Sequence, residues 1–147
     1  MFNIRVDSEY PLGRAGRLLF VLWSLVLVGG FTLAASLEPD PRGFGTHQRL
    51  GLPPCTFRLL FGIHCPSCGM TTSFSNFVRG RFIEAARANF AGLLLEVLCV
   101  LQIPWCWWSV YRGRMWKLAQ PDVALLWLLL TVCGTCALQW MVRLTVG

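Results

Sequence analysis

The chain has 147 residues, of which 55% are hydrophobic and only 14% charged, and its mean hydropathy is +0.56. A soluble domain carries about 25% charged residues, so this composition argues against a water-soluble protein and favours one that lies in lipid. The net charge of +6 fits loops that meet anionic headgroups. It does not indicate a nucleic-acid-binding protein, because no basic stripe alternates with exposed aromatic residues.

Three apolar segments are long enough to cross a membrane: residues 18–37, 90–111 and 123–146. A helix needs about 20 apolar residues to span the hydrocarbon core of a bilayer. Aromatic residues gather at the end of the second segment, as at a membrane–water interface; they are Trp105, Trp107, Trp108 and Tyr111. The sequence therefore predicts an all-α membrane protein, a single domain over residues 1–147 with three transmembrane helices.

The first segment has a second interpretation. Basic residues, an apolar stretch and then Ala34-Ala35-Ser36 also fit a cleaved signal peptide. The apolar stretch is longer than the ~7–15 residues typical of signal peptides, so we favour a retained spanning helix.

The orientation is predicted from lysine and arginine residues. Arg112, Arg114 and Lys117 lie between the second and third helices, which favours a cytoplasmic loop and a cytoplasmic N-terminus. The loop at residues 38–89 would then face outward. This loop also carries basic residues, so the numbers of lysine and arginine residues on the two sides of the membrane are nearly equal. Its six arginines are Arg42, Arg49, Arg58, Arg79, Arg81 and Arg87.

The loop at residues 38–89 contains the run His64-Cys65-Pro66-Ser67-Cys68-Gly69. Proline fits the first turn of a helix, which predicts that Cys65 lies near the N-cap and Cys68 in the first turn. The helix that follows is too polar to cross lipid, so we expect an interfacial or re-entrant amphipathic helix. Its predicted polar stripe is Cys65, Cys68, Thr72, Asn76 and Arg79, and its apolar side is Met70, Phe74, Phe77 and Val78.

The paired cysteines suggest thiol chemistry. The positive end of a helix favours thiolate over thiol, so the motif predicts a redox-active dithiol, with Cys65 as nucleophile and Cys68 as the resolving thiol. No βαβ pattern surrounds the pair, which excludes a thioredoxin domain. A static disulfide, or thiols that only pack, is the alternative without chemistry. Whether the protein is an enzyme stays open.

A metal site uses the same residues. Cys55, His64, Cys65 and Cys68 are four soft or borderline ligands, and His47 is a fifth. Tetrahedral zinc accepts such mixtures, although the spacing matches no recognised zinc finger. This alternative predicts a zinc-stabilised membrane scaffold or assembly factor. The sequence does not distinguish between a bound zinc ion and the absence of a cofactor.

Glu96 lies inside the second apolar segment. A carboxyl group there is costly unless it is protonated, paired or facing water. It suggests either a proton or cation site in a small transporter subunit, or a hydrogen bond that fixes helix packing. We favour packing, with Gln139, Arg143 or Arg87 as the candidate partner. The remaining cysteines (Cys99, Cys106, Cys133 and Cys136) are expected to pack as small apolar residues.

The run from Leu50 to Cys55, the run from Gly62 to Phe74, Arg79-Gly80 and Asn89 together resemble a small bacterial membrane family, domain of unknown function 2752. The resemblance covers about residues 46–95, and the family commonly has Asn-Pro where this chain has Asn89-Phe90. It implies an integral protein of the bacterial inner (plasma) membrane with a paired-cysteine loop, in contact with the bilayer and with a membrane protein partner or a second copy. It supplies no activity. The motif residues Pro66, Gly69, Thr72, Asn76 and Arg79 are expected to support the cysteines.

Overall fold

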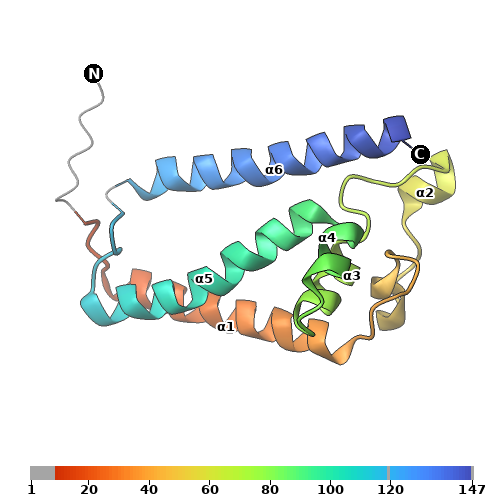
Figure 1. Ribbon diagram of the computed structural model, residues 1–147. Coiled ribbons are helices and arrows are strands. Elements are labelled where there is room, and N and C mark those ends of the chain that lie inside the picture. The colour runs from red at the N-terminus through yellow and green to blue at the C-terminus, as the bar shows by residue number, and fades with distance from the viewer. Residues whose placement is uncertain (1–8, 119, 147) are drawn as a thin grey trace, which may run out of the picture.

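A computed structural model describes residues 9–118 and 120–146, and within them the fold is all-α, as predicted. Three long helices frame the molecule: α1 (Arg14–Ser36), α5 (Phe90–Arg112) and α6 (Pro121–Val146). Figure 1 shows the shorter elements gathered near one end of these helices. They are a 3₁₀ helix, η1 (Thr46–Leu50), and the helices α2 (Thr56–Phe61), α3 (Met70–Phe77) and α4 (Phe82–Ala88).

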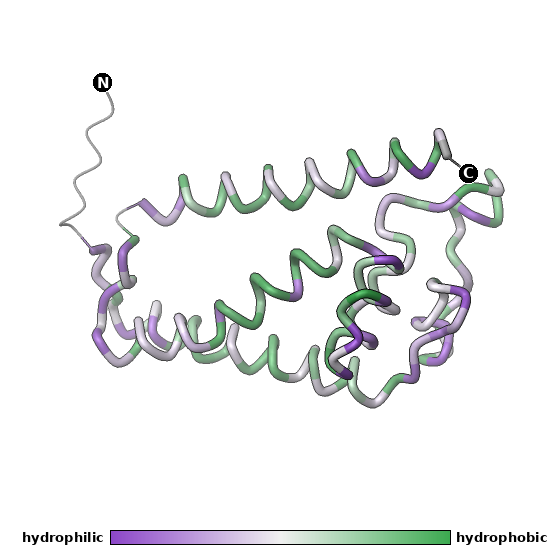
Figure 2. Tube along the Cα trace, viewed as in Figure 1, coloured by the Kyte–Doolittle hydropathy of each residue, from purple (hydrophilic) through white to green (hydrophobic). Residues whose placement is uncertain are grey.

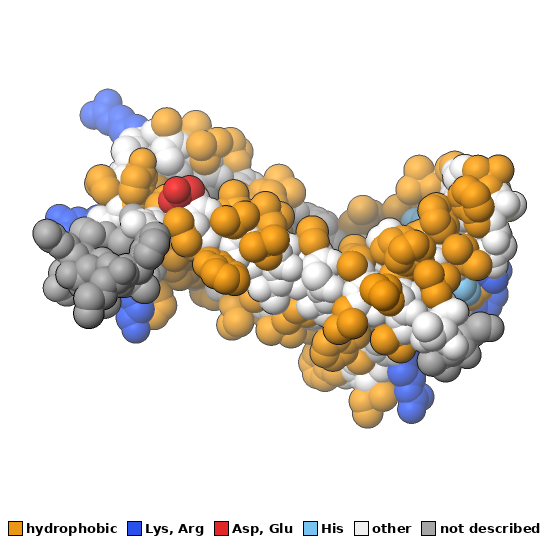
Figure 3. Space-filling view, turned by 90° about the horizontal axis from the view of Figure 1, so that it is seen from above, with side chains coloured by type: hydrophobic (Ala, Val, Ile, Leu, Met, Phe, Trp, Pro, Cys, Tyr) orange, Lys and Arg blue, Asp and Glu red, His pale blue; other side chains and the backbone are white. Residues whose placement is uncertain are grey.

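The three long helices are each long and apolar enough to cross a membrane, which confirms the three predicted spans. Figure 2 shows hydrophobic residues along their lengths. In the view from above in Figure 3, hydrophobic side chains cover much of the length, and the Lys and Arg side chains lie towards the two ends. This distribution suits a protein whose middle lies in lipid and whose ends meet water, so the chain is an integral membrane protein.

Helix boundaries follow from local chemistry. The side chain of Asn89 accepts a hydrogen bond from the backbone N–H of Gly92 (2.9 Å) and so caps α5 at its predicted start. Gly113 ends α5 in the left-handed conformation, with φ +70. Pro121 opens α6, where its missing N–H costs nothing.

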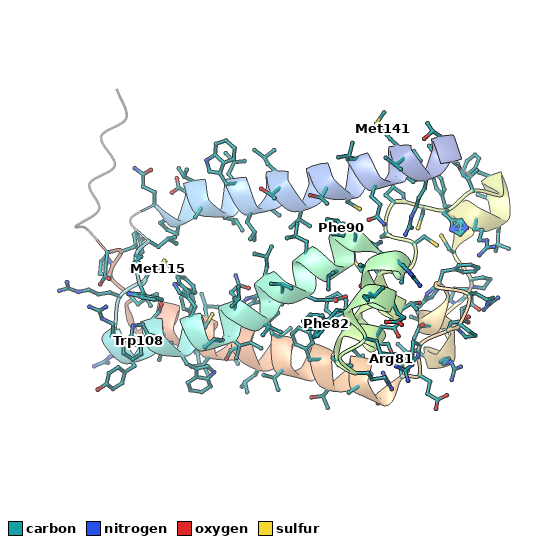
Figure 4. All side chains as sticks on the ribbon, in the orientation of Figure 1. Arg81, Phe82, Phe90, Trp108, Met115 and Met141 are labelled. Atoms are coloured by element: carbon teal, nitrogen blue, oxygen red, sulfur yellow. The ribbon has the colours of Figure 1, made fainter. Side chains whose placement is uncertain are left out.

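Helices α1 and α5 pack side by side. The rings of Phe20 and Trp105 lie 5.5 Å apart, and the indole N–H of Trp23 donates to Gln102 (3.0 Å). Along most of its length α6 packs only against α5 among the described helices, and near its end Trp140 reaches Phe57 of α2 and Arg143 reaches Ala88 of α4. Met141 projects from α6 away from the other helices (Figure 4) and is 62% exposed. Most of α6 therefore faces lipid or another chain.

Helix α3 packs against both α1 and α5. Its polar side chains face inward, since Thr72, Ser73 and Ser75 are fully buried, while Phe74 and Phe77 are half-buried. Phe74 and Phe77 reach Phe31 of α1, with ring centroids 5.8 and 6.1 Å away. Of the two predicted placements, α3 thus matches a segment held between spanning helices better than one lying freely on the interface.

The predicted start of this helix was wrong. Cys65 to Gly69 form turns, in which the N–H of Cys68 donates to Cys65 O (3.0 Å), and α3 begins only at Met70. The N-cap is Gly69, at φ +86 in the left-handed region. Glycine adopts this conformation readily, but it is not helical. A helix that starts at Pro66 therefore cannot continue through Gly69.

Candidate functional site

The turn formed by residues 64–69, here called the motif turn, is held by its carbonyl groups. Asn89 Nδ2 and Arg143 Nη1 both donate to the carbonyl of Cys68, at 3.1 and 3.0 Å. Trp140 Nε1 donates to the carbonyl of His64 (2.8 Å), and Cys136 Sγ lies 3.3 Å from that of Pro66. Three residues of α6 therefore fix the motif turn, and no sequence pattern had pointed to them.

Gly69 allows the motif turn to approach two other backbone segments. A Cβ placed at Gly69 would lie 2.7 Å from the carbonyl oxygen of Gly43 and even closer to that of Ala88. Both the positive φ and this crowding require glycine. Gly69 is thus the point where the loop before η1, the motif turn and the end of α4 meet.

The surroundings of Cys55 favour loss of its thiol proton. Its pKa is lowered chiefly because the backbone N–H of Arg58 hydrogen-bonds to its sulfur. The nearby Cys65 side chain and the positive charge of Arg58 lower this pKa further. These interactions favour the Cys55 thiolate. Cys55 and Cys65 therefore lie together, although the sequence had suggested a pair of Cys65 with Cys68.

Cys68 has the opposite environment. It is 8% exposed, and burial raises its pKa, helped by the nearby Cys65 sulfur and opposed by Arg143. Cys65 is half-buried, and its sulfur lies 3.6 Å from Ser67 Oγ. The structure joins none of the seven cysteines in a disulfide. The roles of Cys65 as nucleophile and Cys68 as resolving thiol stay predictions.

The three cysteines line a pocket of about 700 Å³, here called the thiol pocket. Arg42 and Arg58 also line it, and no carboxylate does among the described residues. The guanidinium of Arg58 lies 3.8 Å from the centroid of the Phe44 ring. Arg42 pairs with Asp40 (2.7 Å), and its hydrogen bonds hold the pKa of that carboxyl at about 2. The pocket lining is therefore positively charged.

The predicted metal ligands do not form one ligand set. Within residues 9–118 and 120–146, no three His, Cys, Asp or Glu side chains lie close enough to hold a metal ion. His47 lines the thiol pocket, but His64 lines a neighbouring pocket instead. The His64 ring packs edge-on against Phe44 at 5.1 Å, and its pKa is lowered by burial first and then by the charges of Arg58 and Arg143.

The predicted supporting residues hold the surrounding structure. Thr72 Oγ1 hydrogen-bonds to Thr46 Oγ1 (2.8 Å), and Asn76 Nδ2 donates to the carbonyl of Thr72 (3.1 Å). Arg79 donates to the carbonyls of Ala34 (3.4 Å) and Ala35 (3.0 Å), at the end of α1. The positive charge of Arg79 there also interacts favourably with the negative end of the helix dipole. These side chains fix the loop to α1 and do not reach the sulfurs.

Glu96 of α5 is fully buried, and neither of its carboxyl oxygens has a hydrogen-bond partner among residues 9–118 and 120–146. The predicted partners were wrong. Gln139 accepts from the N–H of Ala91 (3.0 Å), and Arg143 donates to the motif turn. The neighbouring hydroxyl of Ser73 donates to the carbonyl of Asn89 (3.3 Å).

Residues 55–103 match the model of a family described as a protein of unknown function (DUF2752). This match confirms the predicted family resemblance over that segment, which begins at Cys55 and continues through the motif turn, Asn89 and Glu96. The chain has no match among the curated proteins, and none among the solved structures.

Proposed function

We propose that this membrane protein carries out thiol–disulfide exchange with a disulfide-bearing partner, using Cys55 and Cys65. The observation that carries the proposal is that Cys55 and Cys65 line the same pocket, where the pKa of Cys55 is lowered. A thiolate is the form that attacks disulfides. Cys65, a half-buried second thiol on the lining of the same pocket, can complete the exchange.

The exchange has two steps. The Cys55 thiolate attacks one sulfur of the partner disulfide, so that a mixed disulfide forms and the other partner sulfur leaves as a thiolate. Cys65 then loses its proton to that thiolate through solvent and attacks the Cys55 sulfur. The Cys55–Cys65 disulfide forms, and the second partner sulfur leaves. The protein dithiol is oxidised by two electrons, and the partner disulfide is reduced to two thiols.

Cys68 is a poor choice for either step. It is nearly buried and its pKa is raised, so little thiolate forms near neutral pH. Its carbonyl anchors the motif turn to Asn89 and Arg143. The proposal therefore gives Cys68 a structural role in the turn that carries Cys65.

The lining of the thiol pocket favours anionic groups near the reacting sulfurs. Arg42 and Arg58 stabilise the thiolates that leave during exchange, because opposite charges attract strongly in a partly desolvated site. A pocket of about 700 Å³ can hold a small disulfide or a disulfide-bearing peptide loop.

The second function predicted from sequence, a metal-stabilised scaffold, gains no specific support. No third His, Cys, Asp or Glu joins Cys55 and Cys65 closely enough in the described chain to complete a metal site. A transporter subunit built on Glu96 gains none either, since Glu96 lines neither of the two pockets.

The test compares single cysteine variants of the full chain in detergent micelles. Each is incubated with oxidised glutathione, and the mixed disulfide is located by intact mass and peptide mapping. Cys65→Ser should accumulate glutathione on Cys55, because serine keeps a hydrogen-bond donor but cannot resolve the adduct. Cys55→Ser should accumulate far less, and Cys68→Ser should resemble the wild type. An adduct that accumulates on Cys65 in Cys68→Ser would instead assign exchange to the motif pair.

A further inference from the structure

A second pocket, here called the basic pocket, lies beside the motif turn and does not contain the paired sulfurs of Cys55 and Cys65. It has a volume of about 560 Å³ and is lined by Arg42, Arg87, Arg143 and His64 among others. We propose that it binds the phosphate-bearing headgroup of an anionic phospholipid. This inference does not depend on the thiol chemistry.

The charge of the basic pocket comes from three segments far apart in the chain. Arg42 precedes η1, Arg87 lies in the last turn of α4, and Arg143 lies near the end of α6. No carboxylate lines the pocket among the described residues, and only Arg42 of the three forms an ion pair there, with Asp40. Uncompensated guanidinium groups that converge on one cavity favour an anion.

The arginines can contact an anion without losing their structural bonds. Arg143 is oriented by hydrogen bonds to the carbonyls of Cys68 (3.0 Å) and Ala88 (2.5 Å). A guanidinium carries five N–H donors, so Arg143 keeps others for a ligand. Arg87 is exposed, and no side chain in residues 9–118 or 120–146 hydrogen-bonds to it or pairs with it. It is free to turn towards a headgroup.

The pocket lies where spanning helices end. Arg87 and Ala88 come just before α5 begins at Phe90, and Leu144 belongs to the last turn of α6. A bilayer places its headgroups at this level, and basic pockets between spanning helices bind anionic headgroups.

The rim of the basic pocket points to a lipid over a free phosphate ion. Two lining residues are apolar and exposed, Ile63 at 38% and Leu144 at 45%. Acyl chains attached to a bound headgroup would meet this apolar rim, whereas a free phosphate would gain nothing from it.

The test measures lipid binding to the purified full chain by native mass spectrometry. Dioleoyl phosphatidylglycerol is the anionic probe, and dioleoyl phosphatidylcholine is the zwitterionic one. We expect phosphatidylglycerol to bind more tightly, and Arg87→Gln to weaken its binding about fivefold, as expected for one basic residue at a charged membrane surface. Arg81→Gln is the matched control, because Arg81 is exposed at the other end of α4 and does not line the pocket.

Three outcomes would overturn the proposal. The two lipids could bind equally, or both arginine variants could weaken binding to the same extent, which would indicate only a general attraction to charge. Alternatively, inorganic phosphate could displace phosphatidylglycerol at equal concentration, which would assign the pocket to a free anion. Selective loss in Arg87→Gln without competition by phosphate would support the lipid.

Discussion

Arg143, near the end of α6, donates a hydrogen bond to the backbone carbonyl of Cys68, 75 residues earlier in the chain (3.0 Å). Its other terminal nitrogen donates to the carbonyl of Ala88. One guanidinium therefore joins the last spanning helix to both sides of the cysteine loop. The motif turn depends on α6, although the chain between them forms three other helices.

Replacement of Arg143 should loosen the motif turn. Arg143→Gln cannot bridge both carbonyls, and the loss of charged hydrogen bonds should cost about 2 kcal/mol of unfolding free energy. Thermal unfolding in detergent micelles and the alkylation rate of Cys68 measure the effect. We expect a lower unfolding temperature and faster alkylation of this nearly buried thiol. Arg114→Gln is the control, and equal effects of both variants would argue against the bridge.

Gly69 should not tolerate a side chain. In Gly69→Ala the Cβ would meet the carbonyls of Gly43 and Ala88 at a positive φ, so backbone strain and overpacking together should cost about 3 kcal/mol. Gly80 has a similar φ, +73, but open space around it. Gly80→Ala should therefore cost only about 1 kcal/mol. Equal unfolding temperatures for the two variants would show that the close approach at Gly69 does not occur.

The alkylation of Cys55 and Cys68 should depend differently on pH. The thiolate is the reacting form, so a thiol with a lowered pKa gains its full rate at lower pH, and one with a raised pKa at higher pH. The rate for Cys55 should therefore rise at lower pH than the rate for Cys68. Iodoacetamide labelling followed by peptide mapping measures both rates in one sample.

The contribution of Cys65 to this pH profile can be isolated. Cys65→Ala removes a neighbouring thiol that helps to lower the pKa of Cys55 and should move the Cys55 profile to higher pH. Cys65→Ser retains a donor and should move it less. Identical Cys55 profiles in the wild type and in Cys65→Ala would show that Cys65 does not affect the pKa of Cys55.

Glu96 offers a test of the buried carboxyl group. A buried acceptor without a partner costs about 1–3 kcal/mol, so Glu96→Met, which is apolar and of similar shape, should be at least as stable as the wild type. Glu96→Gln keeps the polarity and should gain less. The comparison uses thermal unfolding in micelles. A clear loss of stability in Glu96→Met would mean that the carboxyl has a polar partner, such as bound water or another chain.

Helix number and approximate position could be predicted because they depend on local composition. An uncharged run such as residues 18–37 is long enough to span, and Asn89 carries its own capping side chain. The start of α3 could not be predicted in the same way. The left-handed conformation of Gly69 goes with the close approach of Gly43 and Ala88, and that approach is set by tertiary packing.

The site was predicted only in part for a similar reason. The spacing of Cys65 and Cys68 is a local signal, so the sequence predicts a pair of these two cysteines. Cys55 and Cys65 line one pocket because of the tertiary path of the chain around α2, which no local pattern marks. The partners from α6, such as Trp140 and Arg143, lie in an apolar helix where nothing local marks them.

The most direct measurement is the location of the first disulfide that forms when the purified protein is mildly oxidised. Trypsin cleaves after Arg49, Arg58 and Arg79, so Cys55 falls in residues 50–58, and Cys65 and Cys68 both fall in residues 59–79. Pairing of Cys55 with Cys65 predicts these two peptides joined by a disulfide, with fragmentation placing the bond on Cys65. A single 59–79 peptide that contains a Cys65–Cys68 bond, with Cys55 still free, would contradict the account.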